Sequence, residues 1–507
     1  MKIVRTQAAI YRMTGVSCYD GNPLIEALPP ILTTLDACSY VEWLPEPPDA
    51  AQRAKPVELR FHELPSVRKL IYLLPEYALY SSIVSVIIRD GYTTRNPVEV
   101  QTWQQLFYTN AASGQAIPPV EPTSHRASGI IFSGISGVGK STFLNRYLQL
   151  YPQVIQHMAY KGKEFIHPQL VWLKIDCPAN GSLSGLVLAF FEGVDKALGT
   201  NYANDYFPKG GKTPTQAVLL REMARIAANY FLGVLIIDEL QNLNRAKTQG
   251  EEGFLSFLSS LVEHIGVPII GVGTPAVTKV FRRRLQDARR AAAMGFYEFQ
   301  RFDEKEDAWS TFTTTLLRYS WLEEPIEATP TLLSAFHFHS QGITAIVIAL
   351  FVLGQCRCLS EGGSFDHVLL EDISKYELAP LQSALRILRS GNAEGSRDFD
   401  DLSFDRAWAE ALEKIEEALL KATIASGASQ NTSPSKRGGE SRPKQTVKKG
   451  ASTASDDPQD MRSLREANDP HEELRKRGVT PINVFALGSE NTETRYAQDP
   501  EGKLIGP

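Results

Sequence analysis

The middle of the chain, from residue 128 to about 302, alternates short apolar runs with segments of helical periodicity. The apolar runs suit buried strands, and they are Ile130–Phe132, Leu170–Ile175, Val234–Ile237 and Pro268–Val272. After the first run, Leu144, Tyr147, Leu148 and Tyr151 recur at the spacing of one helical face. Strands that alternate with helices are typical of a parallel sheet covered by helices. We therefore predict an α/β core over residues 123–302.

The segments on either side have different patterns. Residues 1–122 hold Pro-rich stretches and apolar runs at 70–74 and 83–88, which predict short helices joined by loops. Residues 303–425 show long helical periodicity, at 332–359 and 407–420, which predicts an all-helical domain. Its most apolar part, Ile343–Leu353, is shorter than the ~20 residues that span a bilayer, so we expect a buried helix.

The last part of the chain changes composition. Residues 426–460 are mostly Ser, Lys, Gly, Pro and Thr, which cannot bury enough surface to fold, so a disordered linker is expected. Apolar residues return within 461–507, as in a short docking tail. The chain is therefore predicted to have a core, a helical domain, an N-terminal extension and a tethered tail.

Composition narrows the functional classes. The 507 residues include 53 Lys and Arg against 58 Asp and Glu, a net charge of −5, which argues against a protein that coats DNA by bulk charge but leaves room for a local basic patch. The five cysteines are scattered and form no disulfide or metal-ligand pattern. The first ten residues lack the apolar segment of a signal peptide. We expect a reduced, cytoplasmic setting and no membrane partner.

A glycine-rich loop follows the first predicted strand and precedes the first helix. It has the GxxxxGK[ST] pattern, in which backbone N–H groups cradle phosphates, the lysine reaches the β and γ phosphates of ATP, and the hydroxyl ligates Mg²⁺. The alternative is an ordinary glycine-rich turn that happens to contain a lysine. Such a turn would not need a strand before it and a helix after it, and both are predicted here. The expected nucleotide-binding residues are Gly134, Ile135, Ser136, Gly137, Val138, Gly139, Lys140, Ser141 and Thr142.

Polar residues end two later strands. Asp238 and Glu239 follow a run of four apolar residues, where carboxylates emerge at the ligand-binding edge of a parallel sheet. Asp238 is expected to hold Mg²⁺ through water, and Glu239 to activate the attacking water. Thr274 ends the next run, at the position where AAA+ ATPases carry a sensor of the γ-phosphate. The alternatives are a solvated acidic turn and a simple Thr-Pro turn.

A dense cationic stretch occupies residues 281–290. In an ATPase that works between subunits, an arginine here can reach the γ-phosphate of a neighbouring copy and stabilise the transition state. Arg289 and Arg290 are the candidates for this arginine finger, with Arg282–Arg284 as the fallback. A solvated helix face is the alternative.

Several strings outside the nucleotide motifs resemble TnsC, the family of ATP-dependent regulators of Tn-seven-type transposons. The resemblance covers most of residues 5–390, recurs weakly in the tail, and is carried by strings such as Tyr11–Val16, Asn22–Pro30, Arg89–Tyr92, Leu173–Cys177 and Ala288–Arg290. One feature departs from the common AAA+ pattern, since Ser340–Thr344 holds no sensor arginine where many helical lids begin.

The resemblance implies an ATPase that assembles as a ring or helical filament on duplex DNA and links target selection to transposition. Its implied partners are a TniQ-type target selector, in some systems coupled to a CRISPR effector, and the TnsA and TnsB transposase subunits, with the transposase contacting the tail. Such chains are not themselves nucleases or transposases.

Contacts with DNA are expected at a glycine-containing loop. Lys209, Lys212 and Thr213 could grip successive backbone phosphates without reading bases. The alternative is an exposed loop whose lysines only keep it soluble. The linker offers a second, weaker basic patch, which is Lys436, Arg437, Arg442, Lys444, Lys448 and Lys449.

Two other functions remain open from the sequence. One is an origin-recognition or helicase-loader ATPase, which predicts a DNA-reading domain where the disordered linker is expected. The other is a nucleotide-switched protein scaffold that does not bind DNA.

Overall fold

The computed structural model describes residues 6–111, 129–208, 210–211, 213–245, 267–277 and 294–390, and a few later positions up to 505. The chain divides into two units, residues 1–433 and 434–507. In the second unit the described residues form an antiparallel pair, β9 (Ala497–Gln498) and β10 (Leu504–Ile505). The remainder of the predicted linker and docking tail lies outside the described residues.

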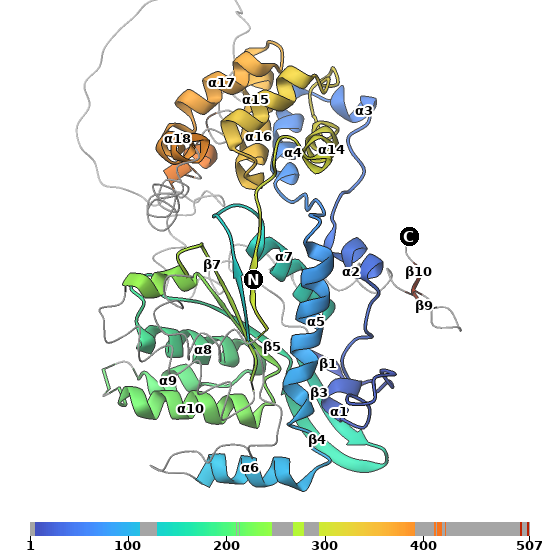
Figure 1. Ribbon diagram of the computed structural model, residues 1–507, viewed down its shortest axis with the longest axis vertical. Helices are drawn as coiled ribbons and strands as arrows, with labels where there is room; N and C mark the ends of the chain where they lie inside the picture. Colours follow the sequence, from blue (N-terminus) through green and yellow to red (C-terminus); the bar gives the residue numbers. More distant parts are fainter. Residues whose placement is uncertain are drawn as a thin grey trace, which may run out of the picture. The chain divides into compact units, whose positions relative to one another are not determined.

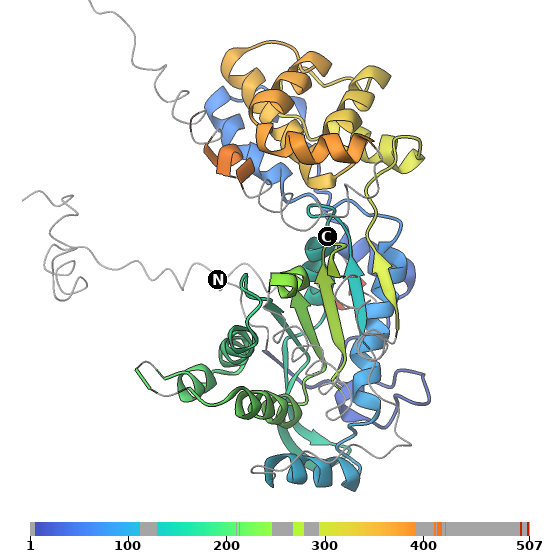
Figure 2. The ribbon, with the colours of Figure 1, turned by 60° about the vertical axis from the view of Figure 1, so that its left-hand side comes forward.

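A five-stranded parallel sheet is the centre of the first unit (Figure 2). In the order β5-β6-β7-β2-β8, its strands are Trp172–Asp176, Val234–Asp238, Ile269–Gly273, Ile130–Ser133 and Phe296–Glu298. Strands β6 and β7 are buried at every position, as in sheets that are covered on both faces. The predicted α/β core is confirmed, and the carboxyl ends of β2, β6 and β7 meet at one edge.

Helices cover both faces of this sheet (Figure 1). Phe132, Ile236 and Val272 share one hydrophobic cluster with the long α5 (Tyr77–Thr93) and with α7 (Lys140–Tyr147). Leu235 and Ile237 point to the opposite cluster. That second cluster includes α8 (Leu183–Leu198), α10 (Gln216–Asn229) and, at its margin, α9 (Tyr202–Tyr206). The short helices η1 (Leu148–Leu150) and η2 (Leu240–Arg245) follow α7 and β6.

The N-terminal segment is built into the rest of the unit. From α5, Tyr80 packs its ring 5.1 Å from Phe132 and 4.8 Å from Phe299, between ring centroids, and donates a hydrogen bond to the Glu298 carbonyl. The other N-terminal helices are α1 (Pro23–Glu26), α2 (Thr34–Val41), α3 (Ala50–Arg53), α4 (Val57–Val67) and α6 (Val100–Ala111). Residues 6–111 therefore complete the hydrophobic core of the unit.

A second small sheet corrects two expectations. Strand β1 (Thr6–Ala8) lies in a segment predicted to be only helices and loops, and it pairs parallel with β3 (Val154–Tyr160). Strand β4 (Lys163–Leu170) returns antiparallel to β3 and ends where β5 begins, so the run Leu170–Ile175 is divided between two sheets. The sequence did not predict this hairpin, because β3 and β4 both mix polar and apolar residues and lack the apolar run of a buried strand. Lys161 and Gly162 form the turn between them.

The described residues from 307 to 390 form the predicted helical domain, or lid. Its elements are α14 (Asp307–Leu317), α15 (Pro330–Ser340), α16 (Thr344–Glu361), α17 (His367–Tyr376), η4 (Ala379–Leu381) and α18 (Gln382–Ser390). The helical segment predicted over 332–359 consists of α15 and α16, which are separated where Gln341 and Gly342 adopt left-handed φ angles of 54° and 72°. N-terminal helix α4 packs against α16.

Helix α16 is long and apolar enough to cross a membrane by length and composition alone. Most of it is buried inside the protein, and core helices pass the same test. The expected buried helix over Ile343–Leu353 is confirmed.

Candidate functional site

The glycine-rich loop joins β2 to α7 with a backbone that only glycine tolerates at two points. A Cβ on Gly134 would lie 2.7 Å from the Phe299 carbonyl oxygen, and one on Gly139 would lie 2.8 Å from the Tyr77 hydroxyl. Gly139 also has a φ of 106° and starts α7 without a side-chain cap. The first N–H groups of α7 are therefore available to an anion.

Lys140 folds back over this loop. Its ammonium donates hydrogen bonds of 2.6 and 3.0 Å to the carbonyl oxygens of Gly134 and Ile135, and the residue is buried. These contacts hold the ammonium beside the mouth of the loop, where the phosphates of a nucleotide would meet it. The contact of Lys140 with the phosphates stays a prediction.

Ser141 and Asp238 come together across the sheet edge. The Ser141 hydroxyl donates to Asp238 Oδ2 at 2.8 Å, and Asp238 Oδ1 accepts from the Glu239 N–H at 3.0 Å. A hydroxyl and a carboxylate are oxygen donors that suit Mg²⁺, so these residues fit the ion that P-loop sites use. When bound, Mg²⁺ neutralises phosphate charge.

Glu239 and Thr274 are linked by a residue that the sequence motifs did not single out. The Gln241 amide donates to Glu239 Oε2 at 2.5 Å, while its oxygen accepts from the Thr274 N–H at 3.1 Å. Thr274 is buried, and the Glu239 side chain is exposed with a left-handed φ of 58°. Nearby, burial raises the pKa of the Cys177 thiol to about 12, so it stays protonated and is no nucleophile.

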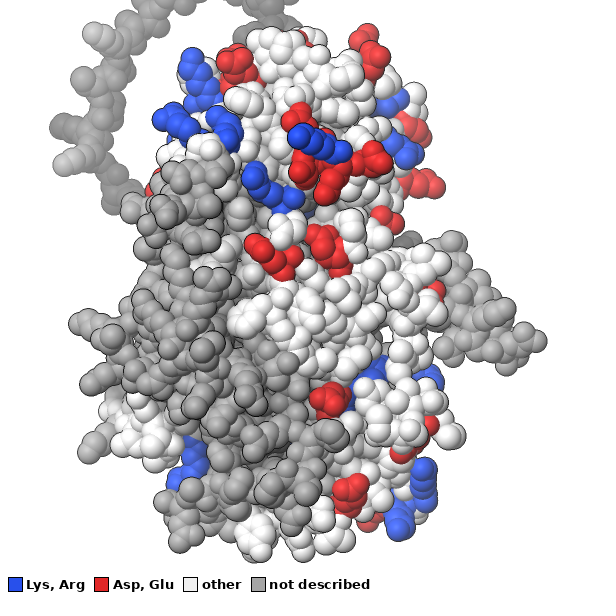
Figure 3. All heavy atoms as spheres, in the orientation of Figure 1, with Lys and Arg blue, Asp and Glu red and all other residues white. Residues whose placement is uncertain are grey.

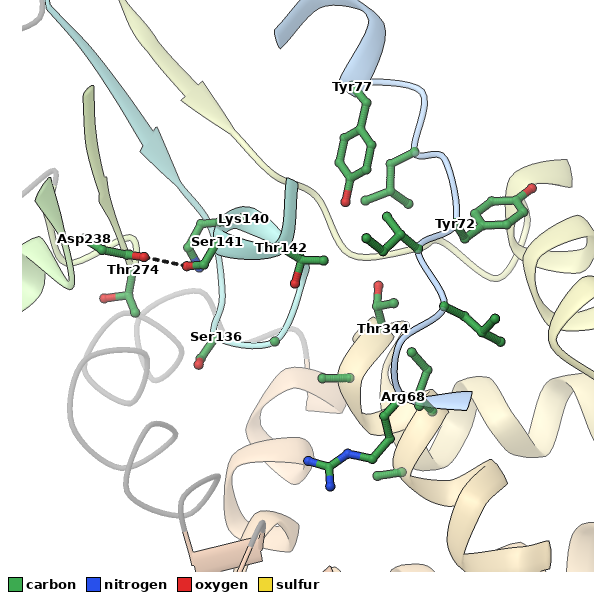
Figure 4. A pocket seen from close by; sticks show the side chains of 18 of the residues that line it. Arg68, Tyr72, Tyr77, Ser136, Lys140, Ser141, Thr142, Asp238, Thr274 and Thr344 are labelled. Carbon is green, nitrogen blue, oxygen red and sulfur yellow. Dashed lines mark hydrogen bonds between the residues drawn. The ribbon is translucent and has the colours of Figure 1, made fainter. Parts of the chain in front are cut away.

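One cavity of about 350 Å³ contains these groups (Figure 4). One end is polar and holds the loop, Asp238, Glu239 and Thr274. The apolar lining includes Tyr72 and Tyr77 from the N-terminal segment and Ile348 from the lid. A cavity with a phosphate-binding end and an apolar, aromatic end suits a nucleoside triphosphate.

The lid closes one side of the cavity at the start of α16. The Ala345 N–H donates to the Gly137 carbonyl oxygen at 3.0 Å, and the Thr344 side chain faces the cavity. Where many lids carry a sensor arginine, this chain therefore places a threonine. Arg68, at the end of α4, also lines the cavity.

The structure thus gathers most of the predicted nucleotide site. The residues that border one cavity are Ser136, Gly137, Gly139, Lys140, Ser141, Thr142, Asp238, Glu239 and Thr274, whereas Gly134, Ile135 and Val138 are not among its lining residues. Sequence reasoning missed Arg68, Tyr72 and Tyr77, because nothing in the N-terminal pattern places them beside the loop. Lys174 carried a signal, since it is a charged residue between the apolar Leu173 and Ile175 within a strand.

The remaining candidates are not placed by the structure. Arg289, Arg290 and the fallback Arg282–Arg284 lie outside the described residues, as do Lys209, Lys212 and the basic residues of the linker. Thr213 is exposed ahead of α10. On the face drawn in Figure 3, the described lid carries mixed positive and negative side chains, without a broad basic stripe among the described residues.

Comparison with known families gives one match. Residues 123–281 match the family described as an AAA domain. A search of curated protein sequences finds no match.

Solved structures with a similar arrangement are remote. They include the Walker-type ATPase PABY2304 of Pyrococcus abyssi (14% identity, TM-score 0.32, 52% of this chain and 71% of that chain). The Aeropyrum pernix ORC1 protein in complex with DNA has 10% identity and a TM-score of 0.35 over 60% of this chain and 77% of that chain. Cdc6p from Pyrobaculum aerophilum has 13% identity and a TM-score of 0.32 over 66% of this chain and 97% of that chain. Scores this low say nothing of what this chain binds.

Proposed function

We propose, from the premise that this chain has the AAA-type P-loop fold and is an ATPase, that it uses ATP to control its own assembly on duplex DNA in transposition. The observation that carries the nucleotide part is the convergence of Lys140, Ser141, Asp238 and Glu239 on one cavity closed by the lid. The DNA and transposition parts rest on the resemblance to TnsC and are expectations.

Each residue of the cavity has a role in the proposed cycle. The loop N–H groups and the Lys140 ammonium bind the phosphates, and the apolar end with Tyr72 holds the base. Ser141 and Asp238 hold the metal. Glu239 accepts a proton from the attacking water, and Gln241, which contacts both Glu239 and Thr274, fixes that carboxylate relative to the sensor.

Assembly supplies the remaining parts. An arginine from a neighbouring copy, Arg289 or Arg290, completes the site between subunits. Lys209, Lys212 and Thr213 hold the phosphate backbone of the duplex without reading its sequence. A TniQ-type selector places the assembly, and the tail at 461–507 engages the TnsA and TnsB transposase.

The test is electron microscopy of the full-length protein with duplex DNA and a non-hydrolysable ATP analogue, with Lys140→Ala as the matched control. Rings or filaments that form only with the analogue and duplex, and not with Lys140→Ala, support the proposal. Assembly with nucleotide but without any effect of duplex favours the scaffold function. Particles that stay monomeric under every condition overturn the assembly.

A second test assigns the arginine finger. Arg289→Ala and Arg290→Ala are made separately, and the ATPase rate is measured against protein concentration. Loss of the concentration-dependent rate in one variant, with ATP affinity retained, identifies the finger because affinity comes from the same subunit's loop. Normal rates in both variants transfer the role to Arg282–Arg284.

A further inference from the structure

Lys174 contacts the metal-binding Asp238 from the neighbouring strand, although no nucleotide motif includes it. It belongs to β5, which pairs with β6 so that Lys174 stands beside Ile236, two residues before Asp238. Its ammonium lies 2.8 Å from Asp238 Oδ2. That oxygen is the same one that accepts the Ser141 hydroxyl.

Both partners of this ion pair are withdrawn from water. The Lys174 and Asp238 side chains are 14% and 7% exposed. In such surroundings charges interact more strongly than at the surface, and removing one partner leaves the other uncompensated. The pair is therefore not a surface salt bridge of negligible effect.

A second contact fixes the lysine. The Lys174 ammonium also donates to the Asn145 amide oxygen at 3.2 Å. Asn145 lies four residues after Ser141 on α7, and residues at that spacing share one helix face. Lys174 thus spans α7 and β6, the two elements that supply the metal-binding oxygens.

The charges explain what this placement does. Without Lys174, the Asp238 carboxylate would lose the ammonium that lies 2.8 Å from it, and the site beside Ser141 would attract divalent cations more strongly. With Lys174 in place, the ammonium supplies the positive charge that Asp238 requires while no metal is bound. The phosphates of ATP bring additional negative charge, which restores the attraction for a cation.

We propose that Lys174 is a positioning residue that neutralises and orients the Asp238 carboxylate in the metal-free site, so that a divalent cation enters with the nucleotide and not before it. The proposal deepens the ATPase function proposed above and rests on it for the role of Asp238. It makes nucleotide the signal that loads the metal.

The test measures Mn²⁺ binding to the full-length protein without nucleotide or DNA, by electron paramagnetic resonance. Wild-type protein binds Mn²⁺ weakly, and Lys174→Met binds it at least about tenfold more tightly, because a neighbouring positive charge is gone. Lys174→Arg, which keeps the charge, behaves as wild type. Lys196→Met, on the exposed side of α8, is the surface control and changes nothing.

The double variant Lys174→Met with Asp238→Asn separates the proposed role from a general structural one. It loses the gain in Mn²⁺ affinity, because the carboxylate that Lys174 neutralises is absent. Should Lys174→Met not fold without metal, Lys174→Gln replaces it, and the rise in melting temperature on adding Mn²⁺ is compared with that of wild type. A rise no larger than in wild type, or Mn²⁺ binding that is equal or weaker, overturns the proposal.

These outcomes are independent of the assembly on DNA. Neither nucleotide nor duplex is present, so a protein that never forms filaments can still show the effect of Lys174. The nucleotide site itself is tested separately, because ATP affinity retained by Lys140→Ala would remove the phosphate loop from the mechanism.

Discussion

At the scale of single residues, Glu239 is the group that separates nucleotide binding from hydrolysis. It follows the metal-binding Asp238 directly, and the Gln241 amide holds its carboxylate. Glu239→Gln keeps the size and the hydrogen-bonding capacity while removing the basicity. We expect ATP affinity within about twofold of wild type and turnover about 100-fold slower, since general bases contribute about 10² to 10⁴.

Calorimetric titration and a phosphate-release assay measure the two quantities. Asn242→Ala is a nearby control outside the proposed chemistry, because its amide donates to the Cys177 carbonyl at 3.0 Å, away from the phosphate loop. Turnover of Glu239→Gln within a few-fold of wild type would falsify the assignment of the base.

A buried histidine makes stability depend on pH. His157 is fully buried between Tyr11 and Gln169, at 2.8 Å from each, and burial lowers its pKa from 6.5 to about 4. The folded state therefore holds the neutral ring, whereas the unfolded chain takes up a proton below pH 6.5. Between pH 6.5 and about 4, this residue removes about 1.4 kcal/mol of stability per pH unit as the pH falls.

Denaturant unfolding at several pH values measures that slope. In His157→Gln the free energy of unfolding falls less steeply with decreasing pH, because one titrating group is absent. This difference in slope is expected even if the variant is less stable overall at pH 7. An unchanged slope would place the titration on other residues.

At the scale of elements, the turn between α15 and α16 places the start of α16 against the phosphate loop. Gly342 has a φ of 72°, and a Cβ there would lie 2.1 Å from the Phe302 carbonyl oxygen, at the link between core and lid. Gly342→Ala should cost about 3 kcal/mol or more, because it adds a backbone clash to the left-handed strain. Thermal unfolding gives the change.

Gly199 is the matched control for this prediction. It ends α8 with a left-handed φ of 73°, but a Cβ at this position would meet nothing within 4 Å, so Gly199→Ala keeps only the conformational cost, about 1 to 2 kcal/mol. Equal losses of stability in the two variants would show that the close approach of the Phe302 carbonyl oxygen does not contribute to the cost of Gly342→Ala.

The elements also show what sequence patterns can and cannot predict. The parallel core, its phosphate loop and the residues ending β6 and β7 follow from local periodicity and motif, because neighbouring residues encode them. The position of Tyr80 against Phe132 and Phe299 depends on packing between segments more than 50 residues apart, which no local pattern contains. The same holds for Lys174, whose partner Asp238 comes from the adjacent strand.

At the scale of the whole molecule, the N-terminal segment completes the hydrophobic core of the first unit. Helix α5 covers one face of the sheet, and α4 packs on lid helix α16. A fragment of residues 123–433, which contains the AAA match, would expose that face. We expect it to lack cooperative thermal unfolding, since the buried apolar area that stabilises the sheet is lost.

The fragment 1–433 is the control, because it keeps the whole first unit and removes only the second. It should unfold cooperatively and retain ATP affinity. A fragment 123–433 that unfolds cooperatively and binds ATP as tightly would show that the N-terminal segment is dispensable for the core.

The hydrogen bond from Ala345 to the Gly137 carbonyl has a consequence for communication within the molecule. Gly137 belongs to the loop that wraps the phosphates, whereas Ala345 begins the helix against which α4 rests. A ligand that rotates the Gly137 peptide would change this main-chain hydrogen bond and so shift helix α16. Because α4 packs on α16, the N-terminal segment would then respond to occupancy of the loop through backbone contacts, without a charged side chain between them.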